Sequence, residues 1–263
     1  MRPDLCLLRG GGDLATGIAW RLTRAGWPVV VCELPEPLTV RRTVALSTAV
    51  SEGRVDIEGM VGRRATSATE VVEIARSGDV GVMVAPDLPA VDADVVIDAR
   101  LAKRNLGTGI DDAELVVGVG PGFTAGVDCH AVIETMRGHH LGRVIWNGRA
   151  AADTGVPGEV GGRSAERVLR APAGGPVEWG HEIGDVVAEG AVLGHIGNAE
   201  ITAPFAGVVR GLIAPGTAVD RGLKIGDVDP RADPAACHEI SDKSLSVGGG
   251  VLEAVLTWLN QSP

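Results

Sequence analysis

The chain has 263 residues, of which 45% are hydrophobic, and its formal net charge is −10. This composition is sufficient for a packed core and excludes a mainly disordered chain, while the negative charge argues against a nucleic-acid-binding protein. The amino-terminal residues contain no long apolar stretch, and no run of the chain reaches membrane-spanning length. We therefore expect a soluble, cytoplasmic protein with no nucleic-acid or membrane partner.

The four cysteines, Cys6, Cys32, Cys129 and Cys237, are widely spaced. No pair has the Cys-x-x-Cys spacing of a zinc or redox site, so we predict no metal site. Cys6 and Cys32 lie in apolar, strand-like runs and are expected to be buried.

The first predicted unit is a strand, a glycine-rich turn, a helix and a second strand. Leu5–Leu8 is a short apolar strand, and Gly10–Gly12 follows it directly. A helix is predicted to begin at Asp13, and Val29–Cys32 has the apolar character of a buried strand. A glycine-rich turn before a helix exposes backbone N–H groups that suit a phosphate.

The spacing in this unit matches the G-x-G-x-x-A pattern of nucleotide-binding turns, followed 23 positions after Gly10 by an acidic residue, Glu33. The predicted ligand-binding residues here are Gly10, Gly11, Gly12, Asp13, Ala15, Thr16 and Glu33. The alternative is a tight turn that binds nothing, with Glu33 a solvated loop acid.

Strands and helices alternate through the next hundred residues, which favours a parallel sheet. The expected elements are a helix at Val40–Val50, strands at Arg54–Glu58 and Met60–Arg64, and a helix at Thr69–Ala75. Three further strands are expected, of which one begins at Val80, one ends at Asp98 and one ends at Gly118. The loops after the last two strands would lie at the ligand-binding edge of such a sheet.

Both of these loops carry candidate binding residues. Lys103 and Arg104 could neutralise an anionic ligand, and Asn105 could donate a hydrogen bond to it. The following "GPGFT" loop adds Gly120, Gly122 and Thr124. The alternative is a solvated basic turn whose charge is balanced by the acidic residues at positions 111 and 112.

Three long segments carry a family resemblance: "RGGGDLATGIAWRLTRAGWPVVVCELPEPLTVRRTVA", "DARLAKRNLGTGIDDAELVVGVGPGFTAGVDCHAVIETMRGHHLGRVIW" and "ISDKSLSVGGGVLEAVL". The chain resembles the YqeB-type proteins nearly end to end. That family is associated with selenium-dependent molybdenum hydroxylase systems and is related to xanthine dehydrogenase accessory proteins, which bind the molybdenum cofactor. The resemblance implies an accessory protein with the molybdenum cofactor as ligand and a molybdenum hydroxylase apoenzyme as partner.

The resemblance draws attention to Cys129 and His130, because molybdenum maturation needs delivered sulfur or selenium and a thiolate is a soft ligand or sulfur carrier. A neighbouring imidazole could lower the pKa of the thiol. We predict these two as catalytic residues. The alternative is a buried thiol that packs beneath the loop.

Residues 171–197 and 203–229 align at an offset of 32, with eight identical positions that include Gly175/Gly207 and Val187/Val219. Short apolar runs between glycines are typical of β-strands. The repeat resembles the biotinyl/lipoyl type of barrel-sandwich hybrid, but its hairpin, residues 197–202, has no carrier lysine. A lid, a partner-docking surface or an oligomer contact then remain as roles.

A last glycine run, Gly248, Gly249 and Gly250, precedes an apolar helical pattern, with Lys243 close by. The functional interpretation is another anion-binding helix entrance. The alternative is close packing of the final helix, and both stay open.

Taken together, the sequence predicts an α/β fold with a Rossmann-like parallel sheet and an inserted barrel-sandwich-hybrid unit. The predicted domains are 1–165, 166–231 and 232–263, the last a strand and helix that return to the first. The predicted function is a maturation factor for a molybdenum hydroxylase that binds the molybdenum cofactor or a nucleotide. The alternatives are an NAD(P)-dependent oxidoreductase and a non-catalytic nucleotide-binding scaffold, and a homo-oligomer is compatible with each.

Overall fold

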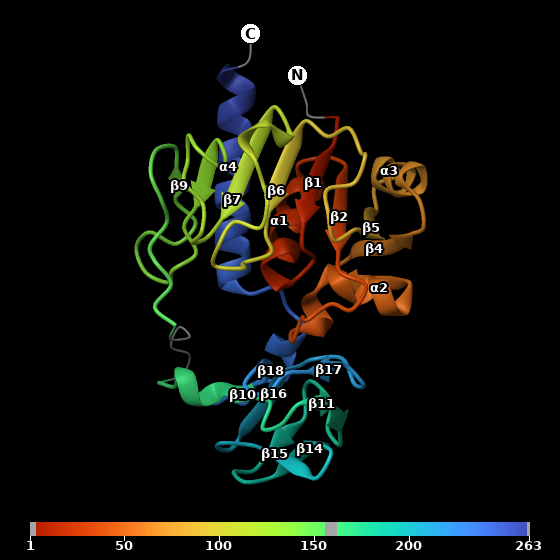
Figure 1. Cartoon of the computed structure of the whole chain (residues 1–263), viewed down its shortest axis with the longest axis vertical. Coiled ribbons are helices and arrows are strands. Elements are labelled where there is room, and N and C mark those ends of the chain that lie inside the picture. Colours follow the sequence, from red (N-terminus) through yellow and green to blue (C-terminus); the bar gives the residue numbers. More distant parts are fainter. Residues whose placement is uncertain (1–3, 156–161, 262–263) are drawn as a thin grey trace. The chain divides into compact units, whose positions relative to one another are not determined.

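A computed structural model describes residues 4–155 and 162–261 of the chain (Figure 1). The chain forms two compact units. Unit 1 comprises Met1–Pro35, Ala45–Asp153 and Ile240–Pro263, and unit 2 comprises Glu36–Val44 and Thr154–Glu239. Among the described residues, no helix combines the length and the apolar character needed to cross a membrane.

Unit 1 is built on a nine-stranded sheet with the order β3-β4-β5-β2-β1-β6-β7-β8-β9. Its strands are β1 Cys6–Arg9, β2 Val29–Glu33, β3 Arg54–Ile57, β4 Met60–Ala65, β5 Val80–Val84, β6 Val95–Asp98, β7 Leu115–Val119, β8 Ala131–Ile133 and β9 Val144–Ile145. All neighbours from β4 to β8 pair in parallel, whereas β3 and β9 are antiparallel edge strands.

Four helices accompany this sheet: α1 Asp13–Arg24, α2 Ala49–Glu52, α3 Ala68–Arg76 and α4 Asp242–Gln261. Helices α1 and α4 pack against each other. Their apolar residues form one core layer with alternate side chains of the strands, while α3 belongs to a second layer with the remaining strand side chains. Successive strand residues face opposite sides, and apolar layers cover both faces of the sheet. The central strands β1, β2, β6 and β7 are therefore apolar except at a few positions, most of them at their carboxyl ends.

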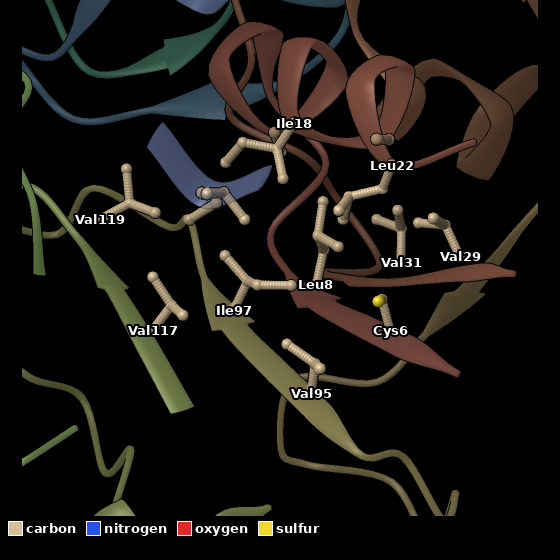
Figure 2. Packing of buried hydrophobic residues seen from close by; sticks show 14 of the residues in the cluster. Cys6, Leu8, Ile18, Leu22, Val29, Val31, Val95, Ile97, Val117 and Val119 are labelled. Carbon is tan, nitrogen blue, oxygen red and sulfur yellow. The ribbon is translucent and has the colours of Figure 1, made fainter. Parts of the chain in front are cut away.

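The first layer shows why α1 forms where the sequence places it (Figure 2). Ile18 and Leu22 lie on one face of the helix and are fully buried against Leu8, Ile97 and their strand neighbours. Each buried aliphatic side chain contributes roughly 1.5–3 kcal/mol in transfer free energy. This burial fixes α1 over β1, and with it the turn that joins them.

Unit 2 contains only strands and 3₁₀ turns among its described residues. It holds a four-stranded sheet (β10-β18-β16-β13), a two-stranded sheet (β11-β17) and a three-stranded sheet (β12-β14-β15). The strands are β10 Val168–Arg170, β11 Gly175–Pro176, β12 Glu178–Trp179, β13 Val186–Val187, β14 Val192–Ile196, β15 Ala199–Thr202, β16 Gly207–Leu212, β17 Ala218–Val219 and β18 Lys224–Asp229. The 32-residue offset of the repeat relates β13 to β17 and β14 to β18.

The predicted fold class needs correction. The sheet is mixed rather than parallel, and β6, β7 and β8 follow one another without an α-helix between them. The segment after β6 is rich in glycine and aspartate and lacks a helical apolar period, so it forms only the 3₁₀ turn Ile110–Asp112. Unit 2 forms three small sheets rather than one lipoyl-like sandwich. The fold is therefore a mixed α/β sheet with a second, all-β unit.

The predicted boundaries also differ from the observed units. Unit 2 begins at Thr154, ends at Glu239 and includes Glu36–Val44, while residues 1–3 and 156–161 of the first predicted domain lie outside the described residues. The predicted helix at Val40–Val50 is replaced by two 3₁₀ turns and the short α2. The cause is tertiary, because Arg41 donates hydrogen bonds to the carbonyls of Ala236 and Glu239 and so joins this segment to unit 2.

Candidate functional site

The candidate site lies at the carboxyl ends of β1, β6 and β7. From β1 the chain runs to β2 and β5 on one side and then crosses to β6 on the other, so the strand order reverses between β1 and β6. In open α/β sheets, ligands bind outside the carboxyl ends of the strands at this reversal. The polar side chains that gather there define what the site can bind.

The glycine turn after β1 is occupied by the chain itself. The amide of Gly10 donates to the carbonyl of Cys32 at 2.8 Å, and the amide of Gly11 donates to the Glu33 carboxylate at 2.7 Å. A Cβ on Gly11 would lie 2.9 Å from the backbone nitrogen of Ser47. The glycines therefore allow close approach of protein backbone, and Glu33 binds the turn.

The other predicted residues of this turn belong to the packing of α1. Asp13 is its first residue and Ala15 is fully buried. The buried Thr16 hydroxyl donates to the carbonyl of Gly12 and accepts from the amide of Leu46. The turn thus has the geometry of a tight connection between strand and helix, which was the alternative interpretation of the sequence.

One buried carboxylate beside this turn binds one arginine directly and a second arginine through a hydroxyl group. Arg100 binds Asp98 through Nε at 3.1 Å and Nη2 at 2.6 Å, and the Asp98 side chain is 2% exposed. The hydroxyl of Thr108 donates to the same carboxylate at 2.7 Å and accepts from Arg9 Nη1 at 2.6 Å. Arg9 ends β1 and Asp98 ends β6, so the strand register brings them together.

The two arginines of this cluster lie close enough to repel each other. Arg9 and Arg100 contribute two positive charges around the single carboxylate of Asp98, and Asp112 attracts Arg9 without a hydrogen bond to it. Burial and then the nearby Arg100 lower the pKa of Arg9, with Asp98 and Asp112 opposing them. An anion at this point would relieve the repulsion between the two guanidinium groups. We call Arg9 and Arg100 the arginine pair.

Several hydrogen-bond donors of the arginine pair are not used among the described residues and could bind such an anion. Within the described part of the chain, both hydrogen bonds of Arg9 are made by Nη1, which leaves its Nε and Nη2. Arg100 uses Nε and Nη2, which leaves Nη1, and its side chain is 20% exposed. Guanidinium donors of this kind match the two oxygens of a carboxylate.

Asn105 and Thr124, both predicted binding residues, lie in one hydrogen-bond network. The Asn105 amide group exchanges hydrogen bonds with the backbone of Thr108 and donates to Asp128 at 3.3 Å. Asp128 accepts from the backbone amide of Thr124, whose hydroxyl accepts from Arg149. The network joins the loops that follow β6 and β7.

Lys103 and Arg104 lie in a strained part of this loop. Leu101 and Lys103 have φ values of 55° and 63°, a region that disfavours residues with a side chain. The Lys103 ammonium pairs with Asp153 at 2.8 Å. Gly122, at φ 110°, lies against Arg104, where a Cβ would be 2.7 Å from its backbone. Such strain is found at ligand sites.

Two further glycines support the same loops. A Cβ on Gly10 would lie 3.1 Å from the Cα of Arg100, and one on Gly120 would lie 2.9 Å from the Thr135 hydroxyl. The glycines that follow β1 and β7 therefore lie against the chain's own 100–104 segment. The sequence had predicted that they would bind a phosphate.

The structure gives Cys129 and His130 no catalytic geometry. Cys129 is fully buried, and burial raises the pKa of its thiol to about 11, so it is a thiol at neutral pH. His130 Nδ1 accepts from the amide of Val116 at 2.9 Å. Val116 lies near the beginning of β7, whereas the candidate site is at the other end of that strand. The geometry favours the alternative of a buried thiol.

The last glycine run is not a helix entrance. Helix α4 begins at Asp242, so Lys243 lies in its first turn and Gly248, Gly249 and Gly250 lie in its interior. A Cβ on Gly248 would overlap the carbonyl of Gly17 in α1, and one on Gly250 would overlap the carbonyl of Gly142. The glycines therefore serve close packing, and no strand precedes this helix among the described residues after 239.

Sequence reasoning missed Arg9 as a site residue and did not select Asp98, Arg100 or Asp128. The available signal was a charged residue at the end of a buried strand, which needs a partner. The order of the strands in the sheet determines which residue becomes that partner.

Within residues 4–155 and 162–261, no three His, Cys, Asp or Glu side chains are arranged to hold a metal ion.

Comparison with known proteins gives one clear relative. No family model matches the chain. The protein named "Uncharacterized protein YqeB" of Escherichia coli strain K12 is 48% identical over 261 residues, which are 98% of this chain and 48% of that protein. The chain thus spans about half the length of the curated relative it matches. This similarity supports the resemblance to YqeB, whose printed name carries no activity.

Solved structures match only weakly. An aspartoacylase family protein from Mesorhizobium loti is 12% identical, covering 87% of this chain and 85% of that one, with a TM-score of 0.28. The ectoine utilization protein EutE from Ruegeria pomeroyi is 14% identical, covering 86% and 57%, with a TM-score of 0.25. A succinylglutamate desuccinylase from Silicibacter is 13% identical, covering 86% and 85%, with a TM-score of 0.25.

The geometry described above corrects the predicted function. The prediction depended on three glycine-rich entrances and a reactive thiol, which this geometry does not provide. The predicted maturation factor and its two alternatives are therefore wrong. TM-scores of 0.25–0.28 are too low to transfer an acylase reaction to this chain.

Proposed function

We propose that this chain binds a small carboxylate at the carboxyl edge of its nine-stranded sheet, between the arginine pair. The observation that carries the proposal is the cluster in which Arg100 binds the buried carboxylate of Asp98 directly and Arg9 reaches it through the Thr108 hydroxyl. The two guanidinium groups repel each other and keep unused donors. A bound carboxylate would supply the acceptors that these donors lack.

A carboxylate fits this site better than a phosphate. Phosphate sites in α/β proteins rely on free backbone amides of a glycine turn at a helix amino terminus. Here the amides of Gly10 and Gly11 are already bound, the second by the carboxylate of Glu33. The guanidinium groups of the arginine pair offer a planar fork that matches the two oxygens of a carboxylate.

Calorimetric titration of the full chain with succinate at low salt tests the proposal. Arg9→Met, and separately Arg100→Met, should weaken binding by roughly tenfold or more, because a hydrogen bond to a charged group contributes about 1.5–3 kcal/mol. The matched control is Arg54→Met, which removes an exposed arginine from the edge strand β3. Circular dichroism establishes that each variant is folded.

The titration has clear contrary outcomes. Absence of succinate binding, or equal affinity in the Arg9, Arg100 and Arg54 variants, would remove the proposal. Tighter binding of inorganic phosphate than of succinate would replace the carboxylate by a phosphate ligand.

The resemblance to YqeB-type proteins supplies a context for this activity. We propose an association with selenium-dependent molybdenum hydroxylase systems as the cellular setting only. Maturation of a molybdenum hydroxylase is no part of this proposal.

A further inference from the structure

Arg104 has a fixed backbone. Gly122 lies directly against it, and any Cβ at that position would come within 2.7 Å of both its Cα and its nitrogen. On one side Lys103 is held at φ 63° and paired with Asp153. On the other, Asn105 is bonded to both the amide and the carbonyl of Thr108. The position from which the Arg104 side chain extends is therefore well defined.

The Arg104 side chain itself is uncommitted. It is exposed, and within the described part of the chain it makes no hydrogen bond or ion pair. By contrast, Arg9 and Arg100 belong to the Asp98 cluster, and Lys103 pairs with Asp153. One loop thus presents a free guanidinium four residues after Arg100.

The loop is maintained at a conformational cost. Two residues with side chains, Leu101 and Lys103, occupy the left-handed region, which is unfavourable for residues that have a Cβ atom. Backbone strain of this kind persists where the surroundings impose it and is concentrated at ligand sites. Here the strained residues lie between Arg100 and Arg104 in the sequence, so they determine how these two arginines are placed relative to each other.

From this arrangement we infer that Arg104 binds a second acidic group of the same ligand, which is therefore a dicarboxylate. One carboxylate lies between Arg9 and Arg100, and the other pairs with Arg104. The inference rests on the proposed function and adds the substrate class to it.

The experiment compares succinate with succinamate, its monoamide of the same length. The wild-type chain should bind succinate roughly tenfold more tightly, as expected for a charged hydrogen bond. In Arg104→Gln this preference should vanish while the affinity for succinamate stays unchanged. Arg104→Lys should restore part of the preference, and Arg54→Gln, an exposed control on β3, should retain all of it.

The outcomes separate the two proposals. Binding of succinamate and succinate with equal affinity by the wild type would overturn the dicarboxylate inference and leave the arginine pair as the carboxylate site. A preference for succinate that survives in Arg104→Gln would also overturn it, since another group would then read the second carboxylate. Failure of both ligands to bind would remove the proposed function itself.

Discussion

Both units bury arginines against aspartates, but the two clusters differ in their place in the topology. In unit 2, Arg167 binds both oxygens of Asp227 at 2.6 and 2.7 Å, and Asp229 accepts from Arg210 and Arg231. Asp227, Asp229 and Arg210 are all less than a tenth exposed. The three arginines come from separate parts of the unit 2 sequence, so the cluster links these chain segments.

The arginine pair of unit 1 has a different setting. It ends a strand and begins a strained loop, keeps unused donors, and lies where the strand order of the sheet reverses. A buried arginine–aspartate pair is therefore not in itself a sign of a ligand site. Arg167 and Arg210 also leave their buried Nε atoms without a hydrogen-bond partner among the described residues, so the position in the topology distinguishes the two clusters.

The largest effect should come from breaking the unit 2 cluster. Asp229→Asn removes the charge that Arg210 and Arg231 share, and leaving a buried charge unpaired costs about 3–5 kcal/mol in the free energy of unfolding. Urea denaturation measures this loss in the free energy of unfolding. The control is Asp79→Asn, in an exposed pair with Arg63 at 3.4 Å, where we expect less than about 1 kcal/mol. Equal effects of the two substitutions would show that the cluster does not fasten unit 2.

The same aspartate predicts an acid-sensitive stability. Burial alone would raise the pKa of Asp229, but hydrogen bonds from Arg231 and the charge of Arg210 outweigh it and lower the pKa from 3.8 to about 2. A carboxyl whose pKa is lower in the folded state stabilises the fold above its unfolded value, and this contribution is lost as the pH falls from 3.8 to about 2. Denaturation curves measured at successive pH values should show this loss in the wild type. Asp229→Asn should lack that component, and an identical pH profile would contradict the assignment.

A smaller effect should distinguish the glycines of α4. A Cβ at position 250 would overlap the carbonyl of Gly142, so Gly250→Ala should destabilise the chain by about 1–3 kcal/mol. A Cβ at position 249 would meet no described atom within 4 Å, and Gly249→Ala should stabilise the helix by about 0.5–1 kcal/mol. Thermal unfolding of both variants tests this. Opposite signs are required, and a shared sign would refute the packing role.

The smallest effect concerns the strained loop. Lys103→Gly and Lys103→Ala both remove the ion pair with Asp153, but only glycine relieves the left-handed backbone at φ 63°. The glycine variant should be more stable than the alanine variant by about 1 kcal/mol. Equal urea midpoints for the two variants would mean that position 103 carries no strain.

Local patterns predicted the strands and helices that depend on neighbouring residues. The strand before Gly10, the helix from Asp13 and the strand at Val29–Cys32 were close to β1, α1 and β2, because apolar periodicity reports burial directly. The order of the strands, with β6 crossing to the far side of β1, depends on contacts distant in the sequence. That order decides which loops share one edge.

The glycine runs show what local patterns could not predict. Gly10–Gly12 and Gly248–Gly250 have the composition of anion-binding entrances, but each faces protein backbone in the structure. A glycine's sequence neighbours do not say what approaches it in space. The site residues Arg9 and Asp98 were obscured for the same reason, since their pairing arises from the parallel register of β1 and β6.

The most direct test of the central claim is a crystal structure of the chain grown with succinate. We expect one carboxylate within hydrogen-bond distance of the free donors of Arg9 and Arg100, and the other carboxylate at Arg104. Succinate bound elsewhere, with water alone between the arginine pair, would contradict the claim that this edge of the sheet is a carboxylate site.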